Sequence, residues 1–238
     1  MPNTYFDFKE FRVDQSQSGM KVTTEGCILG AWAKADDPKH ILDIGAGTGL
    51  LSLMLAQKYP QSSIDAVELE PHAAAEAATN FAKSRWSSRL CLHQVSVQDF
   101  AMNSGLEYDL IICNPPFFNN SQRSTNNKKA RATHSDELSP NDLAGCISKL
   151  LSPQGVAFVL YPLSESQQFE KELGSTTMTV AEELLIYDRP GKSVFRRILK
   201  IVNEPKTTMS SETLIIKESD GSYSSQFVKL LKPYYLHL

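Results

Sequence analysis

Short apolar runs alternate with helical segments from residue 40 onward, and this alternation constrains the fold more than any other feature of the chain. The strand-like runs cover residues 40–44, 64–68, 90–95, 108–113, 156–161, 179–187 and 194–202. Helical patterns cover residues 50–58, 73–83, 138–151 and 165–173. This order predicts an α/β fold with a doubly wound, mostly parallel, seven-stranded sheet. The last two runs flank a turn with Pro190 and Gly191 and predict a C-terminal antiparallel hairpin.

A glycine-rich loop follows the first expected strand. It reads Asp43-Ile44-Gly45-Ala46-Gly47-Thr48-Gly49-Leu50-Leu51 and opens the first helix. Glycines allow a tight turn and a close approach of a ligand to the backbone. The dinucleotide pattern Gly-x-Gly-x-x-Gly is broken at Leu50, and the Gly-Lys-Ser/Thr of a phosphate-binding loop is absent. The loop resembles the Asp-x-Gly-x-Gly-x-Gly loop of class I S-adenosylmethionine-dependent methyltransferases, which implies that Asp43, Gly45, Gly47 and Gly49 contact that cofactor.

Two acids follow the next two strands. Glu68 ends the second strand, 21 residues after Gly47, and this spacing suits a carboxylate that accepts hydrogen bonds from ribose hydroxyls. Glu70 competes for this role, but it directly precedes Pro71 and suits a helix start. Asp99 follows the third strand, where the resemblance implies a contact to the adenine amino group of the cofactor. Either acid could instead cap the helix after it.

The tetrad Asn114-Pro115-Pro116-Phe117 follows the expected strand at 108–113. Its residues suit methyl transfer to a planar amino nitrogen, whose lone pair is delocalised. The side-chain oxygen of Asn114 and the carbonyl of Pro115 can accept both hydrogens of that nitrogen, and the two prolines fix the local backbone. Phe117 can stack on a base, with Phe118 as the second candidate. Asn-Pro alone would be an ordinary turn signal.

Two basic clusters are candidates for contacts to a nucleic acid. Residues 119–134 contain Arg123, Lys128, Lys129 and Arg131 and no acid. The second cluster follows residue 188 and contains Arg189, Lys192, Arg196, Arg197 and Lys200. Such clusters attract phosphates, although any single one of these charges can simply be solvated. Arg196 and Arg197 are adjacent in a strand pattern, so we expect them to point to opposite faces.

Composition narrows the class of protein. The net charge of −3 argues against a protein that coats nucleic acid non-specifically, and no apolar run is long enough to span a bilayer. The first residues lack a signal-peptide pattern, so a cytoplasmic location is expected. The cysteines lack paired metal-ligand spacing, and we expect all four to be reduced core residues and no metal to be needed. They are Cys27, Cys91, Cys113 and Cys146.

The chain as a whole resembles the bacterial tRNA (adenine-N6)-methyltransferases that act beside the anticodon of a valine tRNA. The residues that carry this resemblance are Phe11, Met20 to Gly26, Leu29 to Trp32, the loop from Asp43 to Gly49, Asn114 to Phe118 and the basic hairpin after Tyr187. Glu25 stands where the common family form has Asp, which keeps the carboxylate. The resemblance implies a class I methyltransferase fold, S-adenosyl-L-methionine as cofactor and tRNA as partner.

The N-terminal segment, residues 1–36, precedes a catalytic core over 37–238 in what we expect to be a single domain. Its polar residues 21–26 precede an apolar helix over 27–33. This segment can fold over the cofactor as a lid, with Lys21 and Thr23 as cofactor contacts, or it can simply pack through Ile28, Leu29 and Trp32.

Other functions stay open at this point. A protein glutamine amide presents the same planar NH2 group, but such enzymes usually carry a sizeable N-terminal recognition domain. A guanine-N2 rRNA methyltransferase usually has a duplicated domain, for which the chain is too short. An inactive RNA-binding module on the same fold is a third alternative, and the intact loop and tetrad argue against it.

Overall fold

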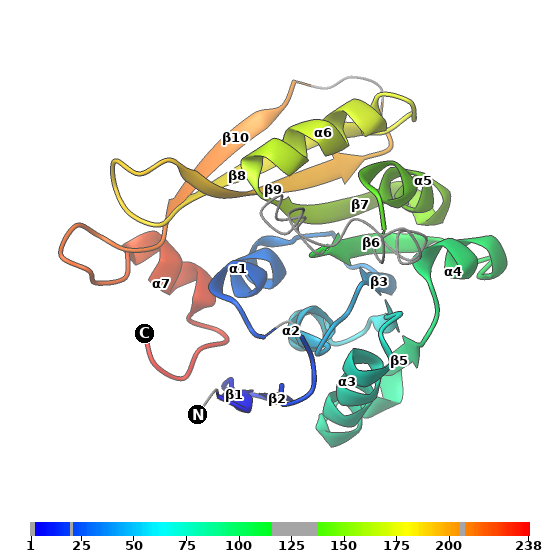
Figure 1. Ribbon diagram of the computed structural model, residues 1–238, viewed down its shortest axis with the longest axis horizontal. Coiled ribbons are helices and arrows are strands. Elements are labelled where there is room, and N and C mark those ends of the chain that lie inside the picture. The colour runs from blue at the N-terminus through cyan, green and yellow to red at the C-terminus, as the bar shows by residue number, and fades with distance from the viewer. Residues whose placement is uncertain (1–2, 20, 116–137, 205–207) are drawn as a thin grey trace, which may run out of the picture.

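A mixed sheet with helices on both faces forms the body of the protein (Figure 1). The computed structural model describes residues 3–19, 21–115, 138–204 and 208–238. The strands are β1 (Tyr5–Asp7), β2 (Arg12–Asp14), β3 (His40–Ile44), β4 (Ser63–Val67), β5 (Leu90–His93), β6 (Tyr108–Cys113), β7 (Leu151–Tyr161), β8 (Thr179–Tyr187), β9 (Val194–Val202) and β10 (Ser210–Ile215). The helices are α1 (Thr24–Trp32), α2 (Leu50–Lys58), α3 (Pro71–Lys83), α4 (Val97–Asn103), α5 (Pro140–Leu150), α6 (Leu163–Leu173) and α7 (Ser225–Leu231).

The main sheet has the strand order β10-β8-β9-β7-β6-β3-β4-β5. Strands β5, β4, β3, β6 and β7 run parallel, as the alternation predicts. Strand β9 runs antiparallel to both β7 and β8, which confirms the hairpin. A short separate sheet pairs β1 with β2.

The expected strand count is wrong by one, because the described residues form eight strands in this sheet. The additional strand, β10, lies at the edge and pairs in parallel with β8. Its first four residues are polar and exposed, so its sequence lacks the apolar signal of a strand. The hairpin is also not terminal, since β10 and α7 follow it.

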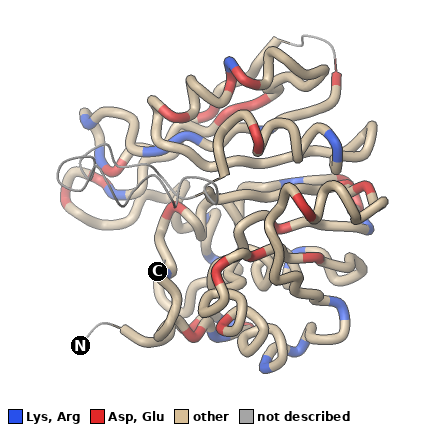
Figure 2. Tube along the Cα trace, turned by 45° about the vertical axis from the view of Figure 1, so that its right-hand side comes forward, with Lys and Arg blue, Asp and Glu red and all other residues tan. Residues whose placement is uncertain are grey.

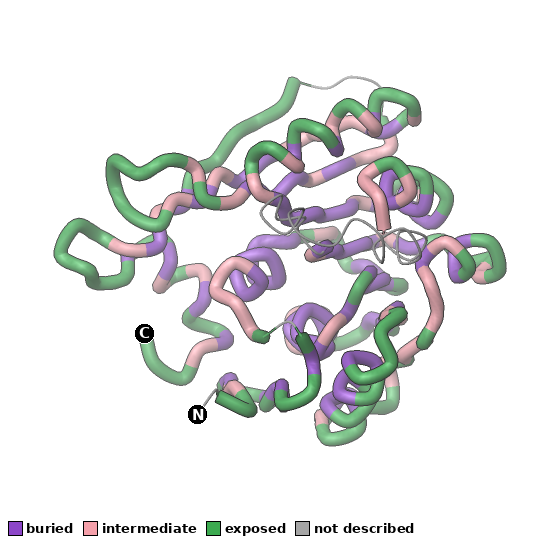
Figure 3. The backbone as a smooth tube through the Cα atoms, in the orientation of Figure 1, coloured by how far each residue is buried: buried purple, intermediate pink, exposed green. Residues whose placement is uncertain are grey.

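Two hydrophobic cores cover the two faces of the sheet. Helices α1, α2, α3 and α7 pack on one face, together with Phe8, Phe11 and Val13 of the N-terminal segment. Helices α4, α5 and α6 pack on the other face. Because both faces are covered, the central strands are mostly apolar and appear largely as buried segments in Figure 3.

The expectation that all cysteines lie in the core is wrong for Cys91. Cys27, Cys113 and Cys146 are buried, whereas Cys91 is exposed on β5, and all four are free thiols. Strand β5 is the edge strand of the sheet, so one side of it has no neighbouring strand. In the described ranges, no helix has the length and apolarity needed to cross a bilayer.

Candidate functional site

The predicted site residues gather at the carboxyl ends of four neighbouring parallel strands. The glycine-rich loop follows β3, Glu68 follows β4, Asp99 lies beyond β5 and Asn114 follows β6. These strands are adjacent in the order β6-β3-β4-β5. Segments far apart in the sequence therefore meet at one edge of the sheet, where ligands of doubly wound folds bind.

The glycine-rich loop turns sharply through three glycines with positive φ. Gly45, Gly47 and Gly49 have φ values of 70°, 56° and 81°, which other residues rarely adopt. A Cβ at Gly45 or Gly47 would meet no atom within 4 Å, so open space lies beside the loop. A Cβ at Gly49 would lie 2.5 Å from the ring of Phe81, so glycine is needed there for packing.

Asp43 lies beneath the loop and is fully buried. Its Oδ2 accepts hydrogen bonds from the backbone N–H of Ser52 at 3.0 Å and from the Ser52 hydroxyl at 2.7 Å. Its Oδ1 is buried and has no hydrogen-bond partner among the described residues. Burial raises the pKa of Asp43 to about 7 despite the bonds from Ser52. The side chain therefore fixes the start of α2 and keeps one oxygen available.

Glu68 and Glu70 contact different parts of the structure, and Glu70 begins a helix as the proline after it predicts. Glu68 accepts from the backbone N–H of Gly47 through Oε2 and from that of Glu70 through Oε1, both at 2.8 Å. Glu70 is the N-cap of α3 and accepts from His72 at 3.0 Å and Ala73 at 2.6 Å. These bonds lower the pKa of Glu70. Only Glu68 is thus directed toward the glycine loop.

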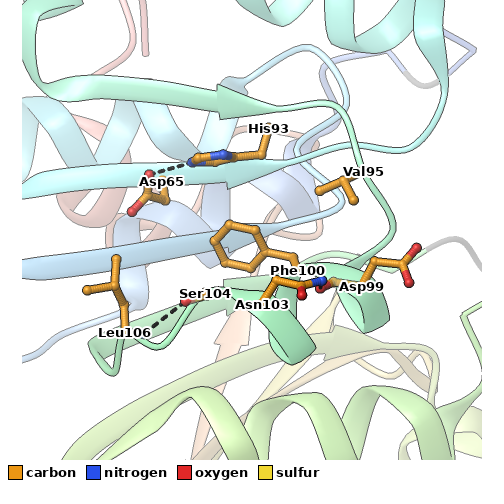
Figure 4. A pocket seen from close by; sticks show the side chains of 8 residues that line it. All are labelled: Asp65, His93, Val95, Asp99, Phe100, Asn103, Ser104 and Leu106. Carbon is orange, nitrogen blue, oxygen red and sulfur yellow. Dashed lines mark hydrogen bonds and ion pairs between the residues drawn. The ribbon is translucent and has the colours of Figure 1, made fainter.

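Asp99 combines a capping role with a position at the end of a pocket. Its Oδ2 accepts from the hydroxyl of Ser96, the N-cap of α4, and its backbone N–H donates to that hydroxyl. A pocket of about 320 Å³ lies between α4 and strands β4 and β5 (Figure 4). Its lining is Asp65, His93, Val95, Asp99, Phe100, Asn103, Ser104 and Leu106. The Asp99 carboxylate points away from the ring of Phe100, at the end where β5 leads into α4.

A hydrogen-bonded cluster occupies the other end of this pocket. Asp65 contacts Nε2 of His93 at 2.7 Å through Oδ1 and accepts from the Tyr108 hydroxyl at 3.0 Å through Oδ2. Within the described ranges, Asp65, His93 and Cys91 are the group whose ligand atoms could hold a metal ion, all within 4.8 Å of one another. Both oxygens of Asp65 already have protein partners, His93 and Tyr108.

Asn114 lies beside the first turn of α1. A Cβ at Gly26 would lie 3.8 Å from Nδ2 of Asn114 and 3.5 Å from Leu50, the first residue of α2. The N-cap of α1 is Thr23, whose hydroxyl accepts from the backbone N–H of Gly26 at 3.1 Å. Pro115 is buried. The predictions for Pro116, Phe117, Phe118, Arg123, Lys128, Lys129 and Arg131 concern residues outside the described ranges.

The N-terminal segment forms hydrogen bonds to α3 and within itself. The Lys21 ammonium donates to the backbone carbonyl of Gln15, and the backbone N–H of Val22 donates to Gln15 Oε1 at 2.7 Å. The Lys21 side chain thus contacts its own segment. Its role as a cofactor contact stays a prediction, as does that of Thr23.

The basic residues of the hairpin differ in their surroundings. Arg189 and Lys192 are exposed in the turn between β8 and β9. Arg196 lies over the ring of Phe195 and has Glu25 of α1 at 3.7 Å. In Figure 2 basic and acidic positions are interspersed over the described chain rather than separated into one large basic field.

Arg197 is not a candidate substrate contact, contrary to the expectation. It is 5% exposed and forms ion pairs with Glu183 and Glu170. It faces α6, whereas Arg196 faces α1, which confirms that the two side chains point to opposite faces of the sheet. A basic residue in a strand pattern gives no signal that its partners are a buried carboxylate on the neighbouring strand β8 and a carboxylate on α6.

Two buried polar residues of α3, Glu76 and Asn80, were not predicted from the sequence. Both contact the N-terminal segment, and Asn80 also contacts the glycine-rich loop. A signal existed, because both fall among the alanines and Phe81 that form the buried face of this helix. The pocket residues Val95, Phe100 and His93, which carry no motif, were also not predicted.

Comparisons with known proteins agree with this arrangement. Residues 27–137 match the family model described as "Methyltransferase small domain". A tRNA1(Val) (adenine(37)-N6)-methyltransferase from Shewanella frigidimarina is 40% identical, with 98% of this chain and 99% of the relative covered. A protein of the same name from Cytophaga hutchinsonii is 39% identical over the whole of both chains.

Two solved structures with a similar fold are described as a methyltransferase and a methylase. A predicted O-methyltransferase from Agrobacterium tumefaciens superposes with a TM-score of 0.69 at 18% identity, covering 87% of this chain and 95% of that one. A ribosomal protein L11 methylase from Lactobacillus delbrueckii has a TM-score of 0.57 at 16% identity, covering 81% and 84%. At these identities the likeness establishes the fold, which is the class I methyltransferase fold.

Proposed function

Because the chain belongs to the family of the tRNA1(Val) (adenine(37)-N6)-methyltransferases, we propose that it methylates the exocyclic N6 of an adenine beside the anticodon of a valine tRNA. S-adenosyl-L-methionine is the methyl donor of this family. The observation that carries the proposal is the position of Asn114. It follows β6, directly beside β3, the strand that leads into the glycine-rich loop, and its side chain lies near Gly26 in the first turn of α1.

The residues around the loop fit the cofactor. Open space lies beside Gly45 and Gly47, and the buried Oδ1 of Asp43 has no partner among the described residues. Glu68 has one protein donor on each oxygen, and a carboxylate oxygen can accept a second bond, so ribose hydroxyls can be bound there. Asp99 lies beyond β5 at the same edge, and its carboxylate can accept a bond from an amino group in addition to the one from Ser96. We propose Asp43, the loop glycines, Glu68 and Asp99 as the cofactor-binding residues.

The chemistry requires alignment more than acid–base catalysis. When bound, the cofactor supplies an electrophilic methyl group on a sulfonium centre. The side-chain oxygen of Asn114 and the carbonyl of Pro115 would accept the two hydrogens of the adenine amino group and direct its lone pair toward that methyl group. The new bond is N–CH3, the broken bond is S–CH3, and the nitrogen then loses a proton. Orientation in a site that excludes water supplies the rate enhancement.

Substrate binding would use the basic residues near this edge. We propose Arg189, Lys192 and Arg196 as phosphate contacts, supported by the exposure of the first two and by the place of Arg196 beside α1. The predictions that Lys128, Lys129 and Arg131 contact RNA and that Phe117 or Phe118 stacks on the adenine remain part of the proposal.

A single-turnover assay with Asn114→Ala tests the mechanism. We expect methyl transfer to tRNA to be abolished while S-adenosyl-L-methionine affinity stays nearly intact, because the lost acceptor acts mostly in the transition state. Turnover at the wild-type rate would refute the role of Asn114. A wild-type protein that binds tRNA but neither binds nor uses the cofactor would instead be an inactive RNA-binding module.

A further inference from the structure

Helix α3 carries two polar side chains on its buried face. Glu76 is 7% exposed and Asn80 is 2% exposed. They are four residues apart and therefore lie one above the other on the same side of the helix. Burial of a carboxylate or an amide is unfavourable unless hydrogen bonds replace the lost water. Their partners therefore indicate what the two residues do.

Asn80 joins the N-terminal segment to the glycine loop. Its Oδ1 accepts from the backbone N–H of Asp14 at 2.9 Å, and its Nδ2 donates to the Asp14 carbonyl at 2.9 Å. The same Nδ2 donates to the carbonyl of Thr48 at 2.8 Å. Thr48 lies between Gly47 and Gly49, so one buried amide holds together two segments that are distant in sequence.

Glu76 fixes the residues that follow Asp14. Its Oε1 accepts from the backbone N–H of Gln17 at 2.9 Å and from the Ser16 hydroxyl at 3.2 Å. Its Oε2 accepts from the backbone N–H of Ser18 at 2.8 Å. We refer to residues 14–18 as the strap. At its start the strap is also held by Gln15, whose backbone N–H donates to the Thr4 carbonyl at 2.8 Å and whose Nε2 donates to the Asn3 carbonyl at 3.0 Å. The bonds to Glu76 add the contacts of residues 16–18 to α3.

The same helix also shapes the glycine loop from its other side. The ring of Phe81 packs where a Cβ of Gly49 would lie, and Glu68, two residues before the N-cap of α3, binds the N–H of Gly47. The Gln15 side chain of the strap in turn accepts a hydrogen bond from the backbone N–H of Val22. Val22 directly precedes Thr23, the N-cap of α1. Helix α3 thus connects the loop, the strap and the segment that leads to the first turn of α1 at Asn114.

We propose that Asn80 and Glu76 are positioning residues that hold the strap against the glycine loop, so that the cofactor site is assembled before the cofactor binds. The proposal rests on the proposed function in that S-adenosyl-L-methionine is taken as the ligand of the loop. If the strap were loose, its residues would lose conformational freedom on binding and the affinity would fall. Neither residue needs to touch the cofactor.

The test compares full-length wild type with Asn80→Asp. This change keeps the side-chain shape but places an acceptor against the carbonyls of Asp14 and Thr48. We expect the Kd and the KM for S-adenosyl-L-methionine to rise about tenfold, as for the loss of one or two hydrogen bonds, with a smaller change in kcat at saturating cofactor. Hydrogen exchange at residues 14–18 should become faster. A merely structural defect would lower the active fraction and hence kcat, without raising KM.

The matched control is Thr79→Ala. Thr79 neighbours Asn80 but is exposed, and its hydroxyl donates only to the Ala75 carbonyl within α3. The Thr79→Ala variant should have the cofactor affinity of wild type and the same hydrogen exchange at residues 14–18. Glu76→Gln removes the charge and one acceptor of the strap, and it serves as the second variant in case Asn80→Asp does not fold.

Unchanged cofactor affinity together with unchanged protection of the strap in the folded variants would overturn the inference. If wild type binds no S-adenosyl-L-methionine, the proposed function fails. Hydrogen exchange then still tests whether α3 holds the strap. If residues 14–18 stay protected in both Asn80→Asp and Glu76→Gln, α3 does not hold the strap.

Discussion

The carboxylate of Glu68 is hydrogen-bonded to the backbone N–H of Gly47 at 2.8 Å, and this bond joins the end of β4 to the centre of the glycine loop. The two residues are 21 positions apart in the sequence and come from neighbouring parallel strands. A residue proposed to bind the ribose therefore also sets the shape of the loop proposed to bind the rest of the cofactor. Removal of the Glu68 side chain should therefore weaken cofactor binding in two ways, through the lost ribose contact and through the altered loop.

Glu68→Ala should weaken S-adenosyl-L-methionine binding roughly ten- to a hundredfold, because a charge-assisted hydrogen bond is lost. Glu70→Ala is the matched control, since Glu70 caps α3 and does not face the loop. It should lower the free energy of unfolding, because a helix cap is lost, and leave cofactor affinity nearly unchanged. Calorimetric titrations of both variants decide this, and equal affinity losses would contradict the separate roles.

Gly49→Ala should be more disruptive than Gly47→Ala, although both glycines have positive φ. Either substitution places a Cβ in the left-handed region at a cost of about 1–2 kcal/mol. Only at Gly49 would that Cβ also meet Phe81, at 2.5 Å. Urea unfolding of both variants measures the difference. A second change, Phe81→Leu, should reduce the extra cost at Gly49 and not the cost at Gly47, and a fully additive double mutant would argue against the clash.

The buried Asp43 should make stability depend on pH. Its pKa rises from an ordinary value of 3.8 to about 7 in the folded state, mainly through burial. The folded protein then binds a proton that the unfolded chain has lost, so the stability contributed by this group is present below about pH 4 and is lost as pH rises to about 7. The slope is at most about 1.4 kcal/mol per pH unit.

Asp43→Asn removes this titration. The free energy of unfolding of wild type, measured from pH 4 to 7, should fall relative to that of the variant. Parallel profiles would show that the Asp43 carboxyl ionises normally in the folded protein.

The exposed and the buried basic residues of the hairpin should affect different properties. The exposed ones should affect tRNA binding, and the buried Arg197 should affect stability. Replacing Arg189 and Lys192 with alanine should weaken tRNA binding and reduce the slope of log affinity against log salt by about 0.7–0.9 for each lost phosphate contact. Stability should be unchanged, because both side chains are exposed. Titrations of tRNA at several salt concentrations test this, and an identical slope would remove the turn from the interface.

Arg197→Met should destabilise the fold by about 3–5 kcal/mol, because it leaves the carboxylate of Glu183 buried without its partner. Thermal and urea unfolding provide the measurement. A stable variant with reduced tRNA affinity would place Arg197 at the substrate after all.

Elements with long apolar runs could be predicted from the sequence. The hairpin strands β8 and β9 and helix α2 have the expected bounds, because runs of apolar residues determine which segments are buried. The site could be located at one edge because the loop, Glu68 and Asn114 each follow a parallel strand. Because Pro71 follows it, Glu70 could be recognised as a helix start rather than as the cofactor contact. The structure confirms that Glu70 is the N-cap of α3.

Features that depend on long-range partners could not be predicted. Strand β10 has a polar sequence and forms because β8 offers an open edge. Arg197 looks like a surface residue until Glu183 is placed beside it. Asn80 lies on the apolar face of α3, but its bond to the carbonyl of Thr48 gives no signal in the sequence. Cys91 looks like a core residue because its neighbours are apolar, yet it lies on the edge strand.

Mass spectrometry of nucleosides from tRNA incubated with the protein and methyl-labelled S-adenosyl-L-methionine tests the proposed function most directly. We expect labelled N6-methyladenosine beside the anticodon of a valine tRNA, and none with Asn114→Ala. Label on the glutamine amide of a protein substrate, with unmodified tRNA, would contradict it.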